Sequence, residues 1–395
     1  MSSSTVTDRV NAPISTTELE RRLSAIRAAM ERERVDVLVM QGNSQEVGCY
    51  VKYVTDVPAG GYGTAVVLPR EDEMTVVMHG PAGQPRVRDE VLRGVGCVLT
   101  SPFFPSAVYT AGAPAQLALE ALAGYERAVI GLVGTAQMSL AFGETVKAAL
   151  RDATFVEASE LVDRVKAIKS DEEQELIRAC ARLQDAAMQA AFGAVAPGVR
   201  ESDIAAVAQQ VASGLGSEAG IVLIGSGPAG GGWTIGPRHL QNRVVEDGDM
   251  VALLVEVNGP GGLYAELGRT AILGDAPARL EEELELVLEA QRFTLERLVP
   301  GASCAEAWDA YNELLRERGR PIEQRVHCHG QGVDLVERPL IRFDETMSVE
   351  AGMNITCHPT WVHDGLWSWI CDNYLIGPDG PGACLHAFPQ RITAL

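Results

Sequence analysis

The sequence has little positive charge, and this shortage limits the partners that the protein can bind. Lysine and arginine together number 33 of the 395 residues, against 53 aspartates and glutamates, so the formal net charge is -20. A surface of that sign repels the phosphate backbone of DNA or RNA. The sequence therefore predicts no nucleic-acid partner.

Long apolar runs and a secretory leader are also missing. No stretch approaches the ~18 uninterrupted apolar residues that a membrane-spanning helix needs. The first dozen residues are polar and are expected to be frayed, and they lack the apolar run and the cleavage site of a signal peptide. We therefore expect a cytoplasmic protein with no membrane partner.

Cysteines at C-x-x-C spacing are absent too. The eight cysteines are scattered, at Cys49, Cys97, Cys180, Cys304, Cys328, Cys357, Cys371 and Cys384. In a reducing compartment, such cysteines are expected to be mostly buried thiols instead of a disulfide framework.

Hydrophobic periodicity predicts an α/β first domain over residues 1–160. A helix is expected over Thr17–Glu33, followed by a buried strand from Val35 to Met40. Further helices are expected over about 114–125 and 135–151, between strand patterns. A helix followed by a buried strand is typical of a layered sheet domain.

A capping signature indicates where the second domain, residues 161–395, begins its first long helix. Ser170 is followed three residues later by Glu173, which predicts a helix starting near Asp171. Paired strand patterns follow over Asp249–Val257 and Leu263–Leu273, and helices return before a carboxy-terminal region of strands and turns.

Histidine is scarce but clustered, and this clustering is the main functional clue in the composition. Four of the seven histidines lie within one stretch near the end, at His327, His329, His358 and His363. His239 lies in a polar loop, where it is a candidate general base. Structural histidines in hydrogen-bonded or core positions explain such residues as well.

Two acidic residues interrupt apolar strand patterns. Glu256 and Glu266 each need a cation, a metal or a proton donor if they are buried there. Cys371 also lies on a strand pattern, where packing explains a cysteine as readily as chemistry does. Aromatic residues make up only 5% of the chain, yet four tryptophans fall near these segments and favour an aromatic-walled pocket, at Trp233, Trp361, Trp367 and Trp369.

The order of short motifs resembles the pita-bread enzymes: creatinase, prolidase, aminopeptidase P and methionine aminopeptidase. The motifs that carry this resemblance are Arg164–Glu173, Asn242–Asp249, Gly262–Tyr264, Arg269–Thr270, His329–Gly332, Glu337–Pro339, Glu350–Met353 and Pro378–Gly380. The resemblance implies an α/β (α+β) protein, with a creatinase-like amino-terminal α/β domain followed by a pita-bread catalytic domain. It also implies a small-molecule substrate and a homodimer.

The metal ligands of the family are largely replaced. Metallopeptidase members hold two metals with Asp, Asp, His, Glu and Glu, and the resemblance carries these positions onto Leu254 or Val255, Glu266, His329, His358 and Cys371. Only His329 keeps the family's residue, and Val336 replaces a substrate-contacting histidine. Neutral side chains cannot offset the charge of two divalent cations, so we do not expect a dinuclear site.

Three interpretations remain. The first is a metal-free, creatinase-like hydrolase of a C-N bond in a small molecule, with no cofactor. In it His239 is the general acid/base, and Glu266, His329 and His358 bind or polarise the substrate. Its substrate-binding candidates are Glu256, Tyr264, Glu337, Trp361 and Cys371.

The second interpretation is a single Zn or Fe ion, because mixed His, Cys and carboxylate sets suit such ions. Its ligands would come from Glu266, His329, His358 and Cys371. The chain would then be a hydrolase, a lyase or an atypical Xaa-Pro aminopeptidase. The third interpretation is a non-enzymatic binding module that keeps the pita-bread shell.

Overall fold

The computed structural model describes residues 12–83 and 92–395, in two compact units that divide between Lys166 and Ala167. The expected frayed amino terminus falls almost wholly outside the described residues. The sequence put the domain boundary after residue 160, within helix α5 (Ser159–Ala167). The two units divide six residues later, at the end of the same helix.

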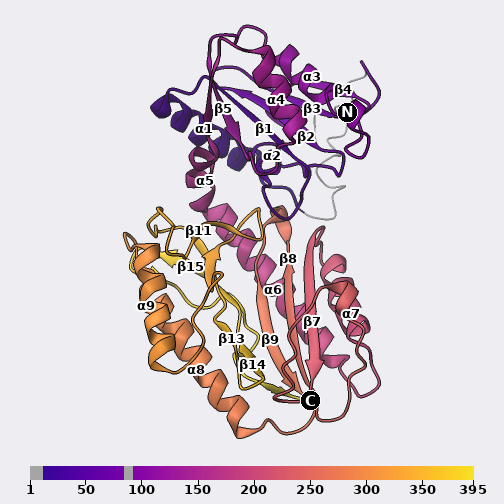
Figure 1. Ribbon diagram of the computed structural model, residues 1–395, viewed down its shortest axis with the longest axis vertical. Helices are drawn as coiled ribbons and strands as arrows, with labels where there is room; N and C mark the ends of the chain where they lie inside the picture. The colour runs from indigo at the N-terminus through magenta and orange to yellow at the C-terminus, as the bar shows by residue number, and fades with distance from the viewer. Residues whose placement is uncertain (1–11, 84–91) are drawn as a thin grey trace. The chain divides into compact units, whose positions relative to one another are not determined.

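The first unit is built around a mixed sheet of six strands, in the order β4-β3-β2-β1-β5-β6 (Figure 1). Its strands are β1 (Val37–Gly42), β2 (Thr64–Pro69), β3 (Met74–His79), β4 (Val95–Ser101), β5 (Val129–Val133) and β6 (Thr154–Glu157). Its remaining α-helices are α1 (Thr16–Glu33), α2 (Tyr50–Thr55), α3 (Ala113–Ala121) and α4 (Leu140–Ala149). The apolar run predicted as a buried strand is β1, in the middle of this sheet, where both faces are covered.

The helix predicted over 135–151 is shorter than expected. α4 begins at Leu140 because Ser139 is its N-cap, with a side chain that accepts the backbone N-H of Phe142. Gly134, with a φ of 68°, turns the chain before this point. Periodicity alone did not separate this turn from the helix.

The second unit begins with the helix that the capping signature predicted. α6 (Asp171–Gly193) starts with a complete capping box between Ser170 and Glu173. One face of α6 packs on a four-stranded sheet of order β17-β9-β8-β7. The strands of this sheet are β7 (Gly220–Gly227), β8 (Met250–Val257), β9 (Leu267–Ile272) and β17 (Thr393–Ala394).

A five-stranded sheet of order β11-β10-β12-β15-β16 completes the second unit, together with a two-stranded hairpin. The strands of the sheet are β10 (Cys328–Gly330), β11 (Glu337–Leu340), β12 (Asn354–Cys357), β15 (Asp372–Gly377) and β16 (Gly380–Pro381). The hairpin consists of β13 (Thr360–His363) and β14 (Leu366–Trp369). An antiparallel bridge between Gly268 and Cys371 links the two larger sheets.

Three further helices flank these sheets. α7 (Glu201–Gly214) lies beside β7, whereas α8 (Ala278–Leu295) and α9 (Cys304–Glu317) lie on the side of β13 and β15 (Figure 1). Over residues 12–83 and 92–395, none of the helices combines the length and the apolar character that a membrane crossing requires.

The strand predicted over Leu263–Leu273 starts later than expected. A short helical turn, η3 (Pro260–Gly262), precedes it, and Gly261 and Gly262 both have positive φ angles, of 70° and 68°. These turns delay the pairing with β8, so β9 begins at Leu267. Glu266 therefore lies immediately before the first residue of a buried strand.

Candidate metal centre

Glu266, His329 and His358 come together in the second unit. One ligand atom from each lies within 4.8 Å of the ligand atoms of the other two, and all three side chains are buried. The Nε2 atom of His329 lies 3.8 Å from Oε2 of Glu266. Three donors at this spacing can hold one metal ion, as the second interpretation requires.

The pairing of β10 with β12 puts the two histidines on one face. His329 lies directly opposite Thr356, and His358 follows Thr356 by two residues. Since alternate residues of a strand share a face, His358 continues the face of Thr356 and meets His329. The two rings lie 5.2 Å apart between their centroids. Pro359 then prevents β12 from continuing as a regular paired strand.

A backbone contact fixes the tautomer of His329. Its Nδ1 atom lies 2.8 Å from the carbonyl oxygen of Gly330, which can only accept a hydrogen bond. The proton therefore resides on Nδ1, and Nε2 keeps its lone pair toward Glu266. Metal-binding histidines are commonly oriented by a hydrogen bond of this kind from the second ring nitrogen.

Burial sets the protonation of the three side chains. It lowers the pKa of His329 to about 4 and the pKa of His358 well below its ordinary value. Both imidazoles are therefore neutral at pH 7, the form that binds metals. Burial also raises the pKa of Glu266 to about 7, although hydrogen bonds from Cys371 and Thr356 oppose this shift.

We expect a measurable pH signature of Glu266 in metal-free protein. Its folded pKa of about 7 lies above the ordinary value of 4.5, so the folded state binds this proton more tightly. The resulting stabilisation is complete below pH 4.5 and is lost as the pH rises toward 7. Urea unfolding of EDTA-treated wild type and Glu266→Gln should show the wild type losing stability relative to the variant across this interval.

The comparison with Glu266→Gln isolates this effect. His329 and His358 titrate in both proteins, and their lowered pKa values give the opposite pH dependence in each, so the difference between the two proteins reports mainly on Glu266. A difference in unfolding free energy that does not change between pH 4.5 and 7.5 would contradict the raised pKa.

The donor set fits one metal better than two. Two histidines and one glutamate form a known catalytic zinc set, and the same combination holds iron in non-haem enzymes. Cys371, the fourth candidate ligand, is buried, and its Sγ atom lies 3.3 Å from Oγ1 of Thr356. It is not part of the three-residue cluster. Burial and the nearby Glu266 charge also raise the pKa of this thiol well above its usual range, which disfavours the thiolate.

The cluster lines a cavity of about 760 Å³ that lies wholly in the second unit. Of the two positions where the resemblance located the first aspartate of the family, Leu254 lines this cavity and Val255 packs in the core. Glu256 lines the cavity as well, as strand alternation requires. An apolar side chain thus occupies the position of the missing ligand, which argues against a second metal.

Of the other predicted site residues, some line the cavity and some do not. Trp361 lines it and donates its indole N-H to Glu283. Tyr264 and Glu337 are buried but are not among the residues that line the cavity, and Glu337 instead pairs with Lys169 at 2.7 Å. His239 is exposed on the short turn η2 (Arg238–Leu240) and does not line the cavity either.

Sequence reasoning missed several residues that the structure brings to the site. Thr356 donates a hydrogen bond to Oε2 of Glu266 at 3.2 Å, and Arg325 lines the cavity. Leu223 and Ile235 add to its apolar wall. Arg325 lies in an irregular segment without a motif, and its position four residues before His329 was the available signal.

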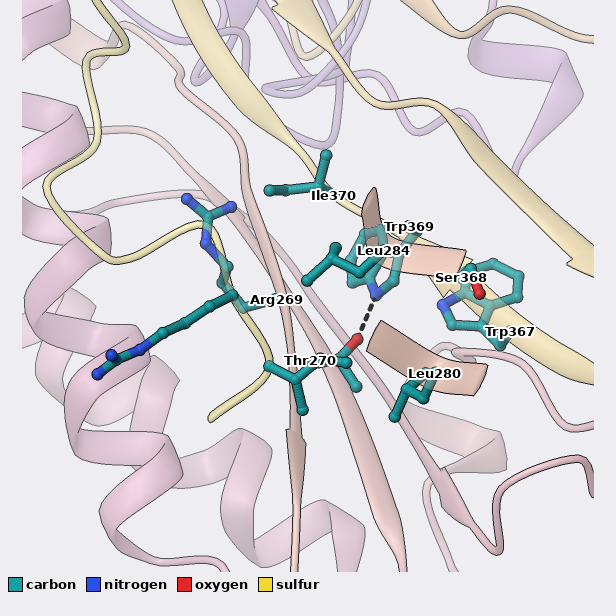
Figure 2. Close-up of a pocket in the computed structure, with 10 residues that line it drawn as sticks. Arg269, Thr270, Leu280, Leu284, Trp367, Ser368, Trp369 and Ile370 are labelled. Carbon is teal, nitrogen blue, oxygen red and sulfur yellow. Dashed lines mark hydrogen bonds between the residues drawn. The ribbon is translucent and has the colours of Figure 1, made fainter. Parts of the chain in front are cut away.

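A second pocket, lined in part by residues of β14, is too small to be the site (Figure 2). Its volume is about 10 Å³, close to the space that one water molecule needs. Trp367 and Ser368 line it, and each has a buried polar atom without a partner within the described part of the chain. The indole N-H of Trp369 instead reaches Oγ1 of Thr270 at 3.1 Å, as Figure 2 shows.

Comparisons with known proteins agree with this fold. The model of Metallopeptidase family M24 matches residues 175–380. A probable dipeptidase, PepE of Mycobacterium tuberculosis, is 26% identical over 242 residues, which cover 60% of this chain and 63% of the relative. The match thus spans less than two thirds of that protein. Creatinase of a Bacillus species is 24% identical over 390 residues, covering 89% of this chain and 85% of the relative.

A solved structure is similar over nearly the whole chain. The crystal structure of dipeptidase PepE from Mycobacterium ulcerans superposes with a TM-score of 0.77, at 22% identity, and covers 97% of this chain and 99% of that one. This likeness confirms the predicted fold: an amino-terminal domain followed by a pita-bread domain. Since the family model spans just over half of the chain, the chain belongs to metallopeptidase family M24.

Proposed function

We propose that this protein is a single-metal hydrolase that cleaves the C-N bond of a small amide. The observation that carries the proposal is the buried cluster of Glu266, His329 and His358 at the wall of a large cavity. The relatives named dipeptidase and creatinase support a substrate with a C-N bond. The expected homodimer stays a prediction.

Residues of the second unit would bind the metal and orient the substrate. Glu266, His329 and His358 would hold the metal, with Thr356 orienting the carboxylate of Glu266. A divalent cation at such a site supplies Lewis-acid polarisation of a carbonyl oxygen and lowers the pKa of a water molecule. Glu256 is a second carboxylate at the cavity wall, and Gln331 fixes it with a hydrogen bond of 2.9 Å. We infer that Glu256 orients the amide, or accepts a proton from the attacking water and gives it to the departing nitrogen.

The volume of the cavity supports a small substrate. Ligand pockets for compounds of drug size are typically about 300–1,000 Å³, and the cavity here lies within that range. Its wall is largely apolar and aromatic, with a few convergent polar groups, which is the usual composition of a small-molecule site.

We expect chelation to abolish turnover and Zn²⁺ or Fe²⁺ to restore it. The protein is assayed against N-acyl amino acids and dipeptides before and after dialysis with EDTA. Loss of the metal should lower the rate by ~10³-fold or more, since Lewis-acid stabilisation is worth several kcal/mol. A rate that is unchanged in protein shown to be metal-free by elemental analysis would overturn the proposal and favour the metal-free interpretation.

His239→Ala gives a second way to separate the two interpretations. In the metal-free interpretation, this change removes the general acid/base and should lower turnover by ~10²–10⁴-fold. In the single-metal interpretation, the exposed His239 does not touch the reacting atoms, so both the metal content and most of the turnover should remain.

A further inference from the structure

An arginine at the cavity has no partner for its charge. Arg325 lies between α9 and β10, lines the cavity and is exposed. Within residues 12–83 and 92–395, no hydrogen bond or ion pair engages its guanidinium group, since only its backbone N-H bonds to Glu323. Its positive charge also contributes to lowering the pKa values of Glu266, His329 and His358, which line the same cavity. A guanidinium group that is free to pair is well suited to a carboxylate.

The acidic residues of the cavity, by contrast, are already engaged. Among the described residues, three carboxylates line the cavity. Glu256 accepts a hydrogen bond from Gln331, and Glu266 belongs to the metal cluster. Glu323 accepts the backbone N-H groups of residues 324 and 325, at 2.9 and 2.7 Å. Each of these carboxylates thus already has a hydrogen-bond partner or a place in the metal cluster, whereas the guanidinium group of Arg325 has neither within the described part of the chain.

Another part of the lining is apolar. We call it the apolar wall, and it consists of Leu223, Ile235, Leu254, Trp367 and Trp369. These residues pack into one cluster, and the centroids of the two indole ring systems are 5.9 Å apart. Large aromatic and aliphatic surfaces of this kind bind hydrocarbon, and burying an unpaired charge against them is costly.

From this arrangement we propose that the substrate is an N-acyl amino acid. Its free carboxylate pairs with Arg325, and its uncharged acyl group packs against the apolar wall, so that the amide between them lies at the metal cluster. This inference rests on the proposed function and goes beyond it, because it excludes a dipeptide with a free amino terminus as the preferred substrate.

Three hydrolysis-resistant probes test the proposal by calorimetric titration of the protein as purified. 4-Oxo-6-phenylhexanoic acid mimics 3-phenylpropanoylglycine, with a methylene group in place of the amide nitrogen. The second probe, 4-oxo-6-phenylhexanamide, lacks the negative charge. The third, 5-amino-4-oxo-6-phenylhexanoic acid, adds the ammonium group of a dipeptide.

We expect the acid to bind at least ~10-fold more tightly than its amide, the usual gain from a hydrogen bond to a charged group. It should also bind at least about fivefold more tightly than the amino acid probe, because the added ammonium group is desolvated against the apolar wall. Equal affinity of the acid and its amide, equal affinity of the acid and the amino acid probe, or binding of none of the three at 10 mM would overturn the proposal.

Arg325→Gln tests the assigned residue. The variant should bind the acid and the amide equally, while its affinity for the amide matches that of the wild type. Arg316→Gln is the matched control, since Arg316 is an exposed arginine on α9 that pairs only with Glu313 within the described residues. A variant that keeps the preference for the acid would remove Arg325 from the proposal.

The binding and turnover measurements distinguish a failure of the proposed substrate class from a failure of the proposed function. If the probes discriminate as expected but no N-acyl amino acid is hydrolysed, the proposed function is wrong and the binding preference stands. If amides are hydrolysed but the acid probe has no advantage, the substrate class is wrong and the proposed function stands.

Discussion

His329→Ala is expected to remove both the metal and the activity. His329 is the ligand whose tautomer is fixed by the backbone, and the variant leaves only Glu266 and His358 at the cluster. Bound Zn or Fe should fall from about one equivalent in the wild type to less than about a tenth, because catalytic sites generally need three protein ligands. Turnover should fall by ~10³-fold or more with it. Elemental analysis by ICP mass spectrometry and initial rates on the same samples provide the measurement.

Two controls show whether the loss is specific. His363→Ala removes a half-exposed histidine that does not line the cavity, and it should leave both quantities unchanged. Cys371→Ser keeps a group that can bond to Thr356, and since Cys371 lies outside the three-residue cluster, the metal content should also remain. If Cys371→Ser lost as much metal as His329→Ala, the thiol of Cys371 would instead be a metal ligand. Metal retention in His329→Ala would contradict the assigned site.

Arg269→Met should be the most destabilising of the substitutions considered. Arg269 forms a buried ion pair with Asp372, and both side chains are at most 1% exposed. Its other N-H groups donate to the carbonyl oxygens of Gly268, Cys371, Phe388 and Pro389. Replacing it leaves the charge of Asp372 buried without compensation, which typically costs about 3–5 kcal/mol. The free energy of unfolding in urea measures the loss.

The control is again an arginine in a salt bridge, but an exposed one. Arg316 and Glu313 are 56% and 63% exposed, so Arg316→Met should change the unfolding free energy by less than about 1 kcal/mol. The double variant Arg269→Met, Asp372→Leu should recover part of the loss, because the unpaired charge is removed. An Arg269→Met protein within 1 kcal/mol of the wild type would show that the pair contributes little beyond its own desolvation.

Local signals in the sequence predicted much of the fold. The Ser170–Glu173 capping box marked the start of α6, because its two hydrogen bonds involve residues only three positions apart. The start of α4 at Leu140 and the end of α3 at Ala121 were less predictable, since the turns before α4 and after α3 depend on single residues that interrupt a continuing apolar pattern. The two-domain architecture was predicted from the order of the M24 motifs, since local signals indicate single helices and strands but not how they assemble.

The candidate site was predictable only in part, for a related reason. His329 and His358 stood out as rare residues in strand patterns, and their pairing follows from neighbouring strands. Apart from its position four residues before His329, Arg325 carries no signal in the sequence, because its importance depends on a cavity formed by segments from residue 221 to residue 369. The loop of His239 satisfied the same sequence criteria as a catalytic loop, yet only tertiary packing decides that it is exposed.

The alternation along β12 also constrains how this site can change in evolution. Thr356 and His358 face the metal cluster, whereas Ile355 and Cys357 face the apolar core. A one-residue insertion ahead of Cys357 would reverse these two faces of the strand. The thiol of Cys357 would then enter the cluster, and the imidazole of His358 would be buried in the core. Substitution can therefore exchange ligands at this centre one at a time, but a single inserted codon in β12 would replace one ligand type with another and disrupt the core in the same step.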